Sequence, residues 1–177
     1  MNVFIAGPRA TRTLNQKVKN RIDKVIESNF TILVGDAAGI DKQIQTYCHS
    51  VRYSNIKVFA SNGKARNNIG RWEVINVQVP PNVRGFDFYA TKDLEMAKEA
   101  DYGFMIWNGK SKGTFNNMVN LVKFNKKILL YMIPDKQFYI LNTMQEVNEI
   151  KNRINKKDSN LINDENISDF KQLSLFR

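Results

Sequence analysis

The sequence Tyr-Gly-Phe-Met-Ile-Trp-Asn-Gly-Lys-Ser-Lys-Gly-Thr-Phe-Asn-Asn spans residues 102–117. Its apolar run from Phe104 to Trp107 is typical of a buried strand, and the run stops at a loop of glycine, lysine and serine. A helical pattern begins directly after this loop. The first backbone N–H groups of a helix have no partners within the helix, and the helix dipole favours an anion beside them. The stretch therefore predicts an α/β protein that holds a nucleotide-like ligand.

Strand-like and helix-like segments alternate on both sides of this stretch. Strands are expected at residues 3–7, 31–35, 56–60, 102–107 and 127–132, with short strands at 74–79 and 138–141. Helices are expected at about residues 39–53, 91–100 and 114–124. Two further helices begin with capping-box spacings, Thr13 with Gln16 and Thr143 with Glu146. The alternation predicts a Rossmann-like, doubly wound and mainly parallel sheet with helices on both faces.

Three of the expected strands end in residues that suit ligand binding. In open α/β sheets the ligand lies beyond the carboxyl ends of the strands. Arg9 can form paired hydrogen bonds to a phosphate, although a strand-end arginine can also pair with a local carboxylate. Asp36 can bind a ribose hydroxyl, whereas Asp41 is more consistent with helix capping or loop shaping. The candidate ligand-binding residues at these strand ends are Gly7, Arg9, Gly35, Asp36, Gly39, Asp41, Gly109, Ser111, Gly113 and Thr114.

Further candidates lie outside these three loops. Residues 61–72, after the third strand, mix basic, amide and aromatic side chains, and the ligand contacts expected there are Arg66, Asn67 and Trp72. The alternative for this segment is an ordinary solvated loop. Trp107 either stacks on a base or packs under the glycine loop. Asp93 is a candidate general acid or base, although an acidic residue in the first turn of a helix also complements the helix dipole.

The composition is that of a globular chain with a strongly basic balance. The net charge is +10 at pH 7 and the pI is about 9.7, which favours phosphate-bearing partners, although lysine-rich surfaces also serve solubility alone. No block of like charge marks a nucleic-acid-binding arm. One cysteine and one histidine give neither a disulfide framework nor a metal site. No apolar run reaches membrane-spanning length, residues 1–7 do not form a signal peptide, and a single cysteine fits a reducing compartment, so we expect a cytoplasmic protein. We also expect that it requires no cofactor.

Taken together, the three strand-end loops resemble those of the SLOG superfamily, which groups the DNA-processing protein A proteins with the Lonely Guy enzymes. Residues 35–41, Gly-Asp-Ala-Ala-Gly-Ile-Asp, look like the S-G-x-A-x-G-I-D loop of the DNA-processing branch, and Gly-Pro-Arg at residues 7–9 looks like its Gly-[ST]-Arg. Residues 111–117 are similar to the Lonely Guy loop P-G-G-x-G-T-x-x-E, and residues 91–101 look like the related nucleoside deoxyribosyltransferases. The resemblance covers about residues 1–141 and implies a SLOG-like nucleotide-binding Rossmannoid, by analogy a homodimer.

One departure from these families concerns the reaction. In the Lonely Guy and deoxyribosyltransferase families a glutamate serves cleavage of the N-glycosidic bond, and Asn117 stands at that position here. An amide cannot act as a carboxylate nucleophile or base. We therefore place Asn117 among the ligand contacts, and Asp93 is the one catalytic candidate.

The last part of the chain differs in composition. From about Asn155 it becomes polar with mixed charge, which predicts a linker after a domain of residues 1–154. Residues 172–176, Gln-Leu-Ser-Leu-Phe, resemble the peptide by which bacterial replication proteins dock on the β sliding clamp. The partner-binding residues would be Gln172, Leu173, Leu175 and Phe176, with the last two as apolar anchors. Packing of these residues back on the domain is the alternative.

Three functions are consistent with these observations. The first is binding of a nucleotide-derived ligand by a sensor or carrier, docked on the sliding clamp through its tail. The second is a nucleotide N-glycosidase or nucleoside transferase of Lonely Guy or deoxyribosyltransferase type. The third is a single-stranded DNA-binding protein of the DNA-processing type, to which the basic charge would contribute.

Overall fold

The fold is built on one seven-stranded sheet. The computed structural model describes residues 1–159, with the side chains of residues 1–154. Within this range the strands are β1 (Asn2–Ala6), β2 (Thr31–Gly35), β3 (Ile56–Ser61), β4 (Glu73–Val77), β5 (Tyr102–Trp107), β6 (Lys127–Met132) and β7 (Gln137–Leu141). Their order across the sheet is β4-β3-β2-β1-β5-β6-β7, and all neighbours are parallel except β7, which is antiparallel to β6. The predicted Rossmann-like, mainly parallel sheet is confirmed.

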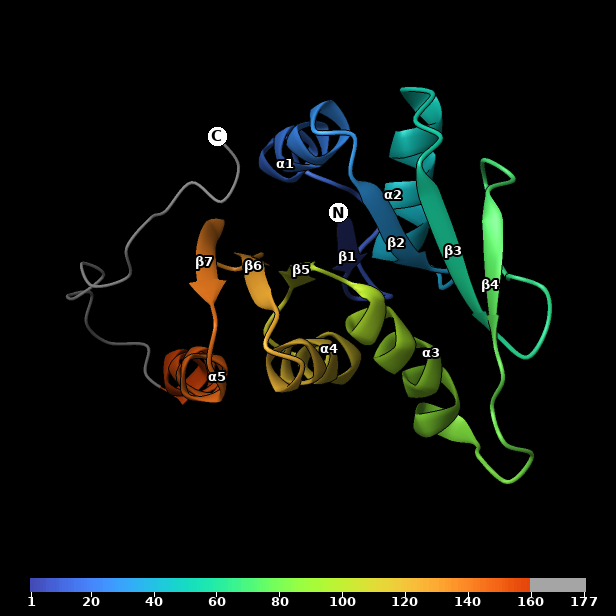
Figure 1. Ribbon diagram of the computed structural model, residues 1–177. Coiled ribbons are helices and arrows are strands. Elements are labelled where there is room, and N and C mark those ends of the chain that lie inside the picture. Colours follow the sequence, from blue (N-terminus) through green and yellow to red (C-terminus); the bar gives the residue numbers. More distant parts are fainter. Residues whose placement is uncertain (160–177) are drawn as a thin grey trace.

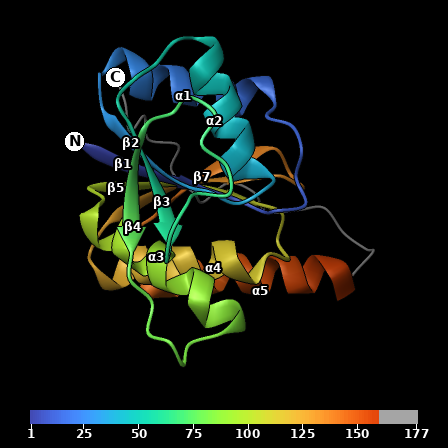
Figure 2. The same cartoon turned by 90° about the vertical axis from the view of Figure 1, so that its right-hand side faces the viewer.

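Helices cover both faces of the sheet. The helices α1 (Gln16–Glu27) and α2 (Ile40–Ser50) lie on one face, and α3 (Gly85–Glu99), α4 (Lys112–Lys123) and α5 (Met144–Ser159) lie on the other (Figure 1). The view turned by 90° shows the same three layers (Figure 2). Strands such as β1 and β5 carry apolar side chains at successive positions because both of their faces are buried. The result is two apolar cores, one on each side of the sheet.

The chain crosses from one half of the sheet to the other between β4 and β5. From β1 it moves outward through β2 and β3 to the edge strand β4, and α3 then returns it to β5, on the far side of β1. Loops that leave the carboxyl ends of β1 and β5 therefore diverge to opposite sides of the sheet. In open α/β sheets this divergence opens a crevice.

Two predicted helix starts are wrong, and one is confirmed. The first helix begins at Gln16, because the N-cap is Asn15, whose side chain accepts a hydrogen bond from the Val18 N–H, and not Thr13. The third helix begins at Gly85 rather than near Thr91, and Gly85 adopts a φ of +61°, which glycine tolerates because it has no Cβ. At the start of α5 the capping box of Thr143 and Glu146 is present, with the Thr143 N–H 2.9 Å from Glu146 Oε2.

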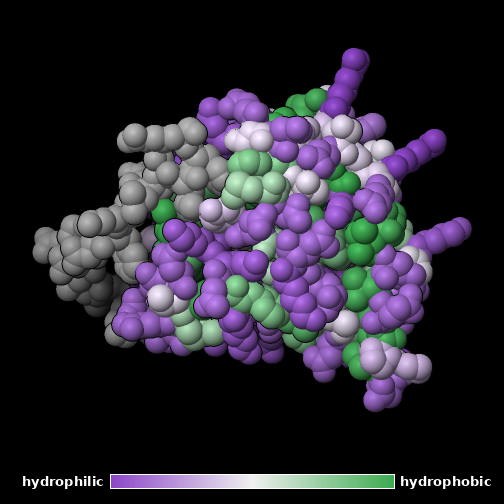
Figure 3. Space-filling model, in the orientation of Figure 1, coloured by the Kyte–Doolittle hydropathy of each residue, from purple (hydrophilic) through white to green (hydrophobic). Residues whose placement is uncertain are grey.

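The surface is mixed in character. Figure 3 shows mainly hydrophilic side chains with smaller hydrophobic areas between them on the face seen in Figure 1. Within residues 1–159, no helix combines the length and the apolar composition needed to cross a bilayer. The helix α5 runs past the domain end expected at residue 154, to Ser159. The expected clamp-docking residues Gln172, Leu173, Leu175 and Phe176 lie outside the described residues.

Candidate functional site

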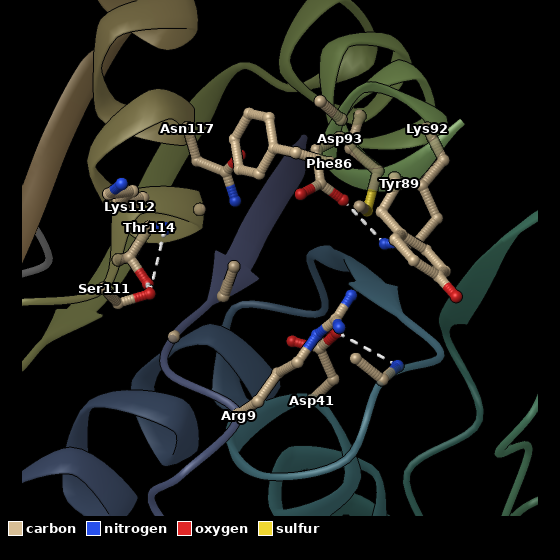
Figure 4. Close-up of a pocket in the computed structure, with 17 residues that line it drawn as sticks. Arg9, Asp41, Phe86, Tyr89, Lys92, Asp93, Ser111, Lys112, Thr114 and Asn117 are labelled. Atoms are coloured by element: carbon tan, nitrogen blue, oxygen red, sulfur yellow. Dashed lines mark hydrogen bonds and ion pairs between the residues drawn. The ribbon is translucent and has the colours of Figure 1, made fainter. Parts of the chain in front are cut away.

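A cavity of about 360 Å³ lies at the crevice beyond the carboxyl ends of the strands. Three of its walls come from the segment after β1, the start of α2 and the start of α4, and the fourth comes from the first half of α3 (Figure 4). Its lining residues are Ala6, Gly7, Arg9, Ala37, Asp41, Gly85, Phe86, Tyr89, Ala90, Lys92, Asp93, Met96, Ser111, Lys112, Gly113, Thr114 and Asn117.

The N-terminus of α4 presents unpaired donors to this cavity. Ser111 is the N-cap, and its Oγ accepts hydrogen bonds from the N–H of Thr114 at 3.3 Å and from the Thr114 hydroxyl at 3.0 Å. Within residues 1–159, the backbone N–H groups of Lys112 and Gly113 donate to no protein atom. A Cβ built on Gly113 would meet no heavy atom within 4 Å, so the backbone at this position faces open space. The helix terminus can therefore receive an anion directly on its backbone.

Asn117 is a buried polar residue whose acceptor is unused. Its side chain lies one turn into α4 and points toward the cavity (Figure 4), and the residue is only 4% exposed. Its Oδ1 has no hydrogen-bond donor among the groups that the structure describes. Leaving a buried acceptor unsatisfied costs about 1–3 kcal/mol. A donor on a bound molecule would satisfy it.

A buried group of charges forms the cavity wall between α2 and α3. Lys92 is 3% exposed, and its Nζ lies 2.6 Å from Asp93 Oδ1. Burial lowers the pKa of Lys92, but the charges of Asp93 and Asp41 outweigh this effect, so the pKa is raised and the ammonium stays charged. Burial raises the pKa of Asp41 to about 7, against the opposing effect of Lys92. The wall therefore holds a carboxyl group that changes charge near neutral pH.

Two arginines lie over the Tyr89 ring at the edge of the cavity. The guanidinium carbons of Arg9 and Arg66 are each 4.6 Å from the centre of the Tyr89 ring. Arg66 is also paired with Asp36, through Nη2 to Oδ1 at 2.6 Å and Nε to Oδ2 at 2.9 Å. The Arg9 guanidinium, in contrast, makes no hydrogen bond or ion pair within residues 1–159. Arg9 is thus held in place by stacking on the Tyr89 ring, and all the N–H donors of its guanidinium remain available to a ligand.

Comparison with known proteins identifies a fold. No family model and no curated protein matches the chain. Among solved structures, the chain is similar to DNA processing protein A from Helicobacter pylori, whose single-stranded DNA binding mode is described as unique. The TM-score is 0.56 with 11% identity, over 89% of this chain and 81% of that one. The fold is of the DNA processing protein A type. At this identity the likeness concerns the fold alone.

The DNA processing protein A type of fold brings eight of the predicted site residues to the cavity. They come from the first-strand loop, the start of α2, α3 and the start of α4, and they are Gly7, Arg9, Asp41, Asp93, Ser111, Gly113, Thr114 and Asn117. Gly7 is required there, because a Cβ would lie 2.7 Å from Ile40 Cγ1 and 2.8 Å from the Ile106 carbonyl oxygen. The three loops thus converge as expected.

The other predicted residues lie behind the cavity lining or away from it. Arg66 and Asn67 both donate to Asp36: the Arg66 guanidinium to its carboxylate, and Asn67 Nδ2 to its backbone carbonyl at 2.8 Å. Gly35 packs beside the Asp41 carboxylate and Gly39 packs on the Arg9 backbone. The two tryptophans are held by hydrogen bonds within the protein: Trp107 Nε1 donates to the Ser111 carbonyl at 3.0 Å, and Trp72 Nε1 donates to the Tyr53 carbonyl at 3.1 Å. Gly109 packs on Ile154.

The contribution of α3 was missed by sequence reasoning, apart from Asp93. Because the sequence pattern predicts a helix start near Thr91, Phe86 and Tyr89 fall outside the expected helices and strands. The signal that could have located them is Lys92, which shares a helix face with Tyr89 and Met96 at spacings of three and four residues. A lysine on an otherwise apolar face predicts a buried charge that needs partners.

Proposed function

We propose that the protein binds a nucleotide-derived ligand in this cavity, as a sensor or carrier. The phosphate would lie on the free N–H groups of Lys112 and Gly113, in the cavity that the unpaired Arg9 also lines. A helix terminus, an arginine and a lysine together favour an anion. Lysine and arginine exceed aspartate and glutamate in this chain by ten, which adds a long-range attraction for phosphates.

The observation that carries this proposal is the unsatisfied Oδ1 of Asn117. A phosphate group accounts for the free donors of α4, and the buried acceptor one turn further along the helix calls for a donor elsewhere on the ligand. A sugar hydroxyl or a base N–H can donate to that acceptor. The cavity therefore favours a ligand that has an anionic end and a hydrogen-bond donor within one nucleotide's length.

The position of Asn117 also favours binding over turnover. The glutamate that serves N-glycosidic cleavage in the families of the resemblance is replaced by this amide. Asp93, the remaining catalytic candidate, is engaged with Lys92 at 2.6 Å. We propose that a bound nucleotide is held without cleavage.

Calorimetric titration with AMP, GMP, CMP and UMP tests the proposal. We expect at least one of them to bind, and chromatography of the mixture after incubation to find no free base. Binding of none of the compounds would remove the proposal. Release of free base would instead support the N-glycosidase alternative.

Variants of α4 separate binding from folding. Gly113→Ala adds a methyl group into open space and raises helix propensity, so the protein should be as stable as wild type while phosphate binding weakens about tenfold. Asn117→Leu removes an unsatisfied buried acceptor and should also leave stability unchanged or higher, with loss of binding. Asn116→Leu, which alters an amide outside the cavity lining, is the matched control and should bind as wild type does.

Single-stranded DNA binding is a second candidate function. It is supported by the net charge of +10 and by the likeness in fold to DNA processing protein A from Helicobacter pylori, a protein that binds single-stranded DNA. Fluorescence anisotropy with a labelled oligothymidylate should then show binding at about 50 mM salt that weakens steeply toward about 200 mM. Absence of binding at the lower salt concentration would exclude this function.

Docking on a sliding clamp is a proposal that rests on the sequence of residues 172–176. The resemblance of Gln-Leu-Ser-Leu-Phe to clamp-binding peptides is its support. Full-length protein should bind a purified bacterial β clamp, and the double variant Leu175→Ala with Phe176→Ala should lose this binding because it removes both apolar anchors. Equal binding of the two proteins would contradict the proposal.

A further inference from the structure

Phe86 is an exposed aromatic side chain on the cavity wall. The large apolar side chains that are exposed within the described part of the chain are Met1, Val51, Val74 and Phe86. Phe86 is 52% exposed, and it alone among these four lines the cavity. A single exposed apolar residue on a protein surface needs no explanation. An exposed ring that forms part of a ligand-sized cavity is a more specific observation.

The position of Phe86 follows from the start of α3. The connection from β4 and the first turn of α3 extend away from the body of the molecule (Figures 1 and 2). Gly85, in a left-handed conformation, is the first residue of α3, and the next residue, Phe86, lines the cavity. In Figure 4 the Phe86 ring extends from α3 toward the side on which Asn117 lies.

The ring of Phe86 has no aromatic or cationic partner within residues 1–159. Its neighbours on the same helix are engaged, since Phe88 and Tyr89 form a perpendicular pair with centroids 5.2 Å apart. Tyr89 also carries the guanidinium groups of Arg9 and Arg66. Among these three rings of α3, Phe86 is the one with a free face at the cavity.

We propose that Phe86 is the surface on which the base of the bound nucleotide stacks. This assignment rests on the proposed function, and it fixes the direction of the ligand: phosphate on Lys112 and Gly113, sugar beside Asn117, and base against Phe86. Stacking on an aromatic ring is tolerant of base identity because every base has a planar face. The contact therefore contributes affinity for purine and pyrimidine nucleotides alike.

The test compares a ligand that has a base with one that lacks it. AMP, UMP and ribose 5-phosphate are titrated into wild type, Phe86→Ala, Phe86→Trp and the control Val51→Ala, which shortens an exposed apolar side chain away from the cavity. We expect Phe86→Ala to bind AMP and UMP about tenfold more weakly and ribose 5-phosphate within about twofold of wild type. Phe86→Trp should restore the affinity for AMP and UMP.

The outcomes separate this assignment from the function on which it rests. If wild type binds AMP or UMP and Phe86→Ala binds them equally well, the role of Phe86 is wrong and the proposed function stands. If Phe86→Ala weakens ribose 5-phosphate as much as AMP, the ring shapes the cavity and does not contact the base. If wild type binds none of AMP, GMP, CMP and UMP, both proposals are wrong.

Discussion

Asp41 brings a titratable carboxyl group to the wall of the cavity. Burial is the largest influence on it and raises its pKa to about 7, and the neighbouring carboxylates Asp93 and Asp36 act in the same direction. Lys92 and the Ala37 N–H, which is 3.3 Å from Asp41 Oδ2, act in the opposite direction. The charge of the cavity therefore changes by one unit near neutral pH.

This titration predicts a pH dependence of stability. Because the pKa of Asp41 in the folded protein lies above the ordinary aspartate value of 3.8, the folded protein binds more protons than the unfolded chain between about pH 4 and 7. The contribution of Asp41 to stability is complete below this range and is lost as the pH rises through about 7, at up to about 1.4 kcal/mol per pH unit. Asp41→Asn removes the titration, so its stability relative to wild type should increase from about pH 5 to 8.

Urea unfolding of both proteins across this pH range measures the effect. Asp87→Asn, which neutralises an exposed carboxylate on α3, is the control variant. A constant difference in unfolding free energy between Asp41→Asn and wild type would contradict the assignment of the titrating group.

At the scale of elements, the loop between β3 and β4 is tied to the end of β2. Asp36 is 3% exposed and accepts hydrogen bonds from the Arg66 backbone N–H at 3.1 Å and from its guanidinium. Burial tends to raise the pKa of Asp36, but these hydrogen bonds outweigh it, and the pKa is lowered. Gln45 of α2 adds a second connection, since its Nε2 donates to the Gly35 carbonyl at 2.9 Å and its Oε1 accepts from the Ile69 N–H at 3.0 Å.

Arg66→Ala should therefore destabilise the fold. It leaves the buried carboxylate of Asp36 with fewer donors, which we expect to cost about 1–2 kcal/mol, because the partly exposed guanidinium lets water replace some of the interaction. Urea unfolding at neutral pH measures the loss. The control variant Lys64→Ala removes an exposed side chain from the same loop and should change stability by less than about 0.5 kcal/mol. Equal losses of unfolding free energy in the two variants would show that the Asp36–Arg66 pair makes no specific contribution to stability.

At the scale of the whole molecule, protection should fall from the centre of the sheet to its β4 edge. The central strand β1 is paired with β2 and β5, and Val3, Phe4 and Ile5 are completely buried. The edge strand β4 is paired only with β3, and Glu73, Val74 and Asn76 are exposed. Hydrogen exchange followed by mass spectrometry should find β1 and β5 slowest and β4 fastest among the parallel strands. Equal protection of β1 and β4 would contradict this order.

Much of the site could be predicted from local sequence. The apolar runs before Gly7, Gly35 and Asn108 identify buried strands, and parallel strands of one sheet place their carboxyl ends along the same edge. The residues that follow these runs therefore meet without any knowledge of packing. The helix after the glycine loop could also be located, although it begins at Lys112 with Ser111 as its N-cap, slightly before the expected start at about residue 114.

The sheet, its helical cover and the convergence of the three loops at the cavity follow from signals in the local sequence. Three other features depend on how the chain packs: α3 completes the cavity with Phe86, Tyr89 and Lys92, Arg66 is paired with Asp36 while Arg9 stays unpaired, and Asn117 Oδ1 has no donor among the described residues. The physical reason is that strand and cap signals act over a few residues. The path of α3 from the edge strand β4 back across the sheet, and the partners of each buried charge, depend on contacts between residues far apart in the chain.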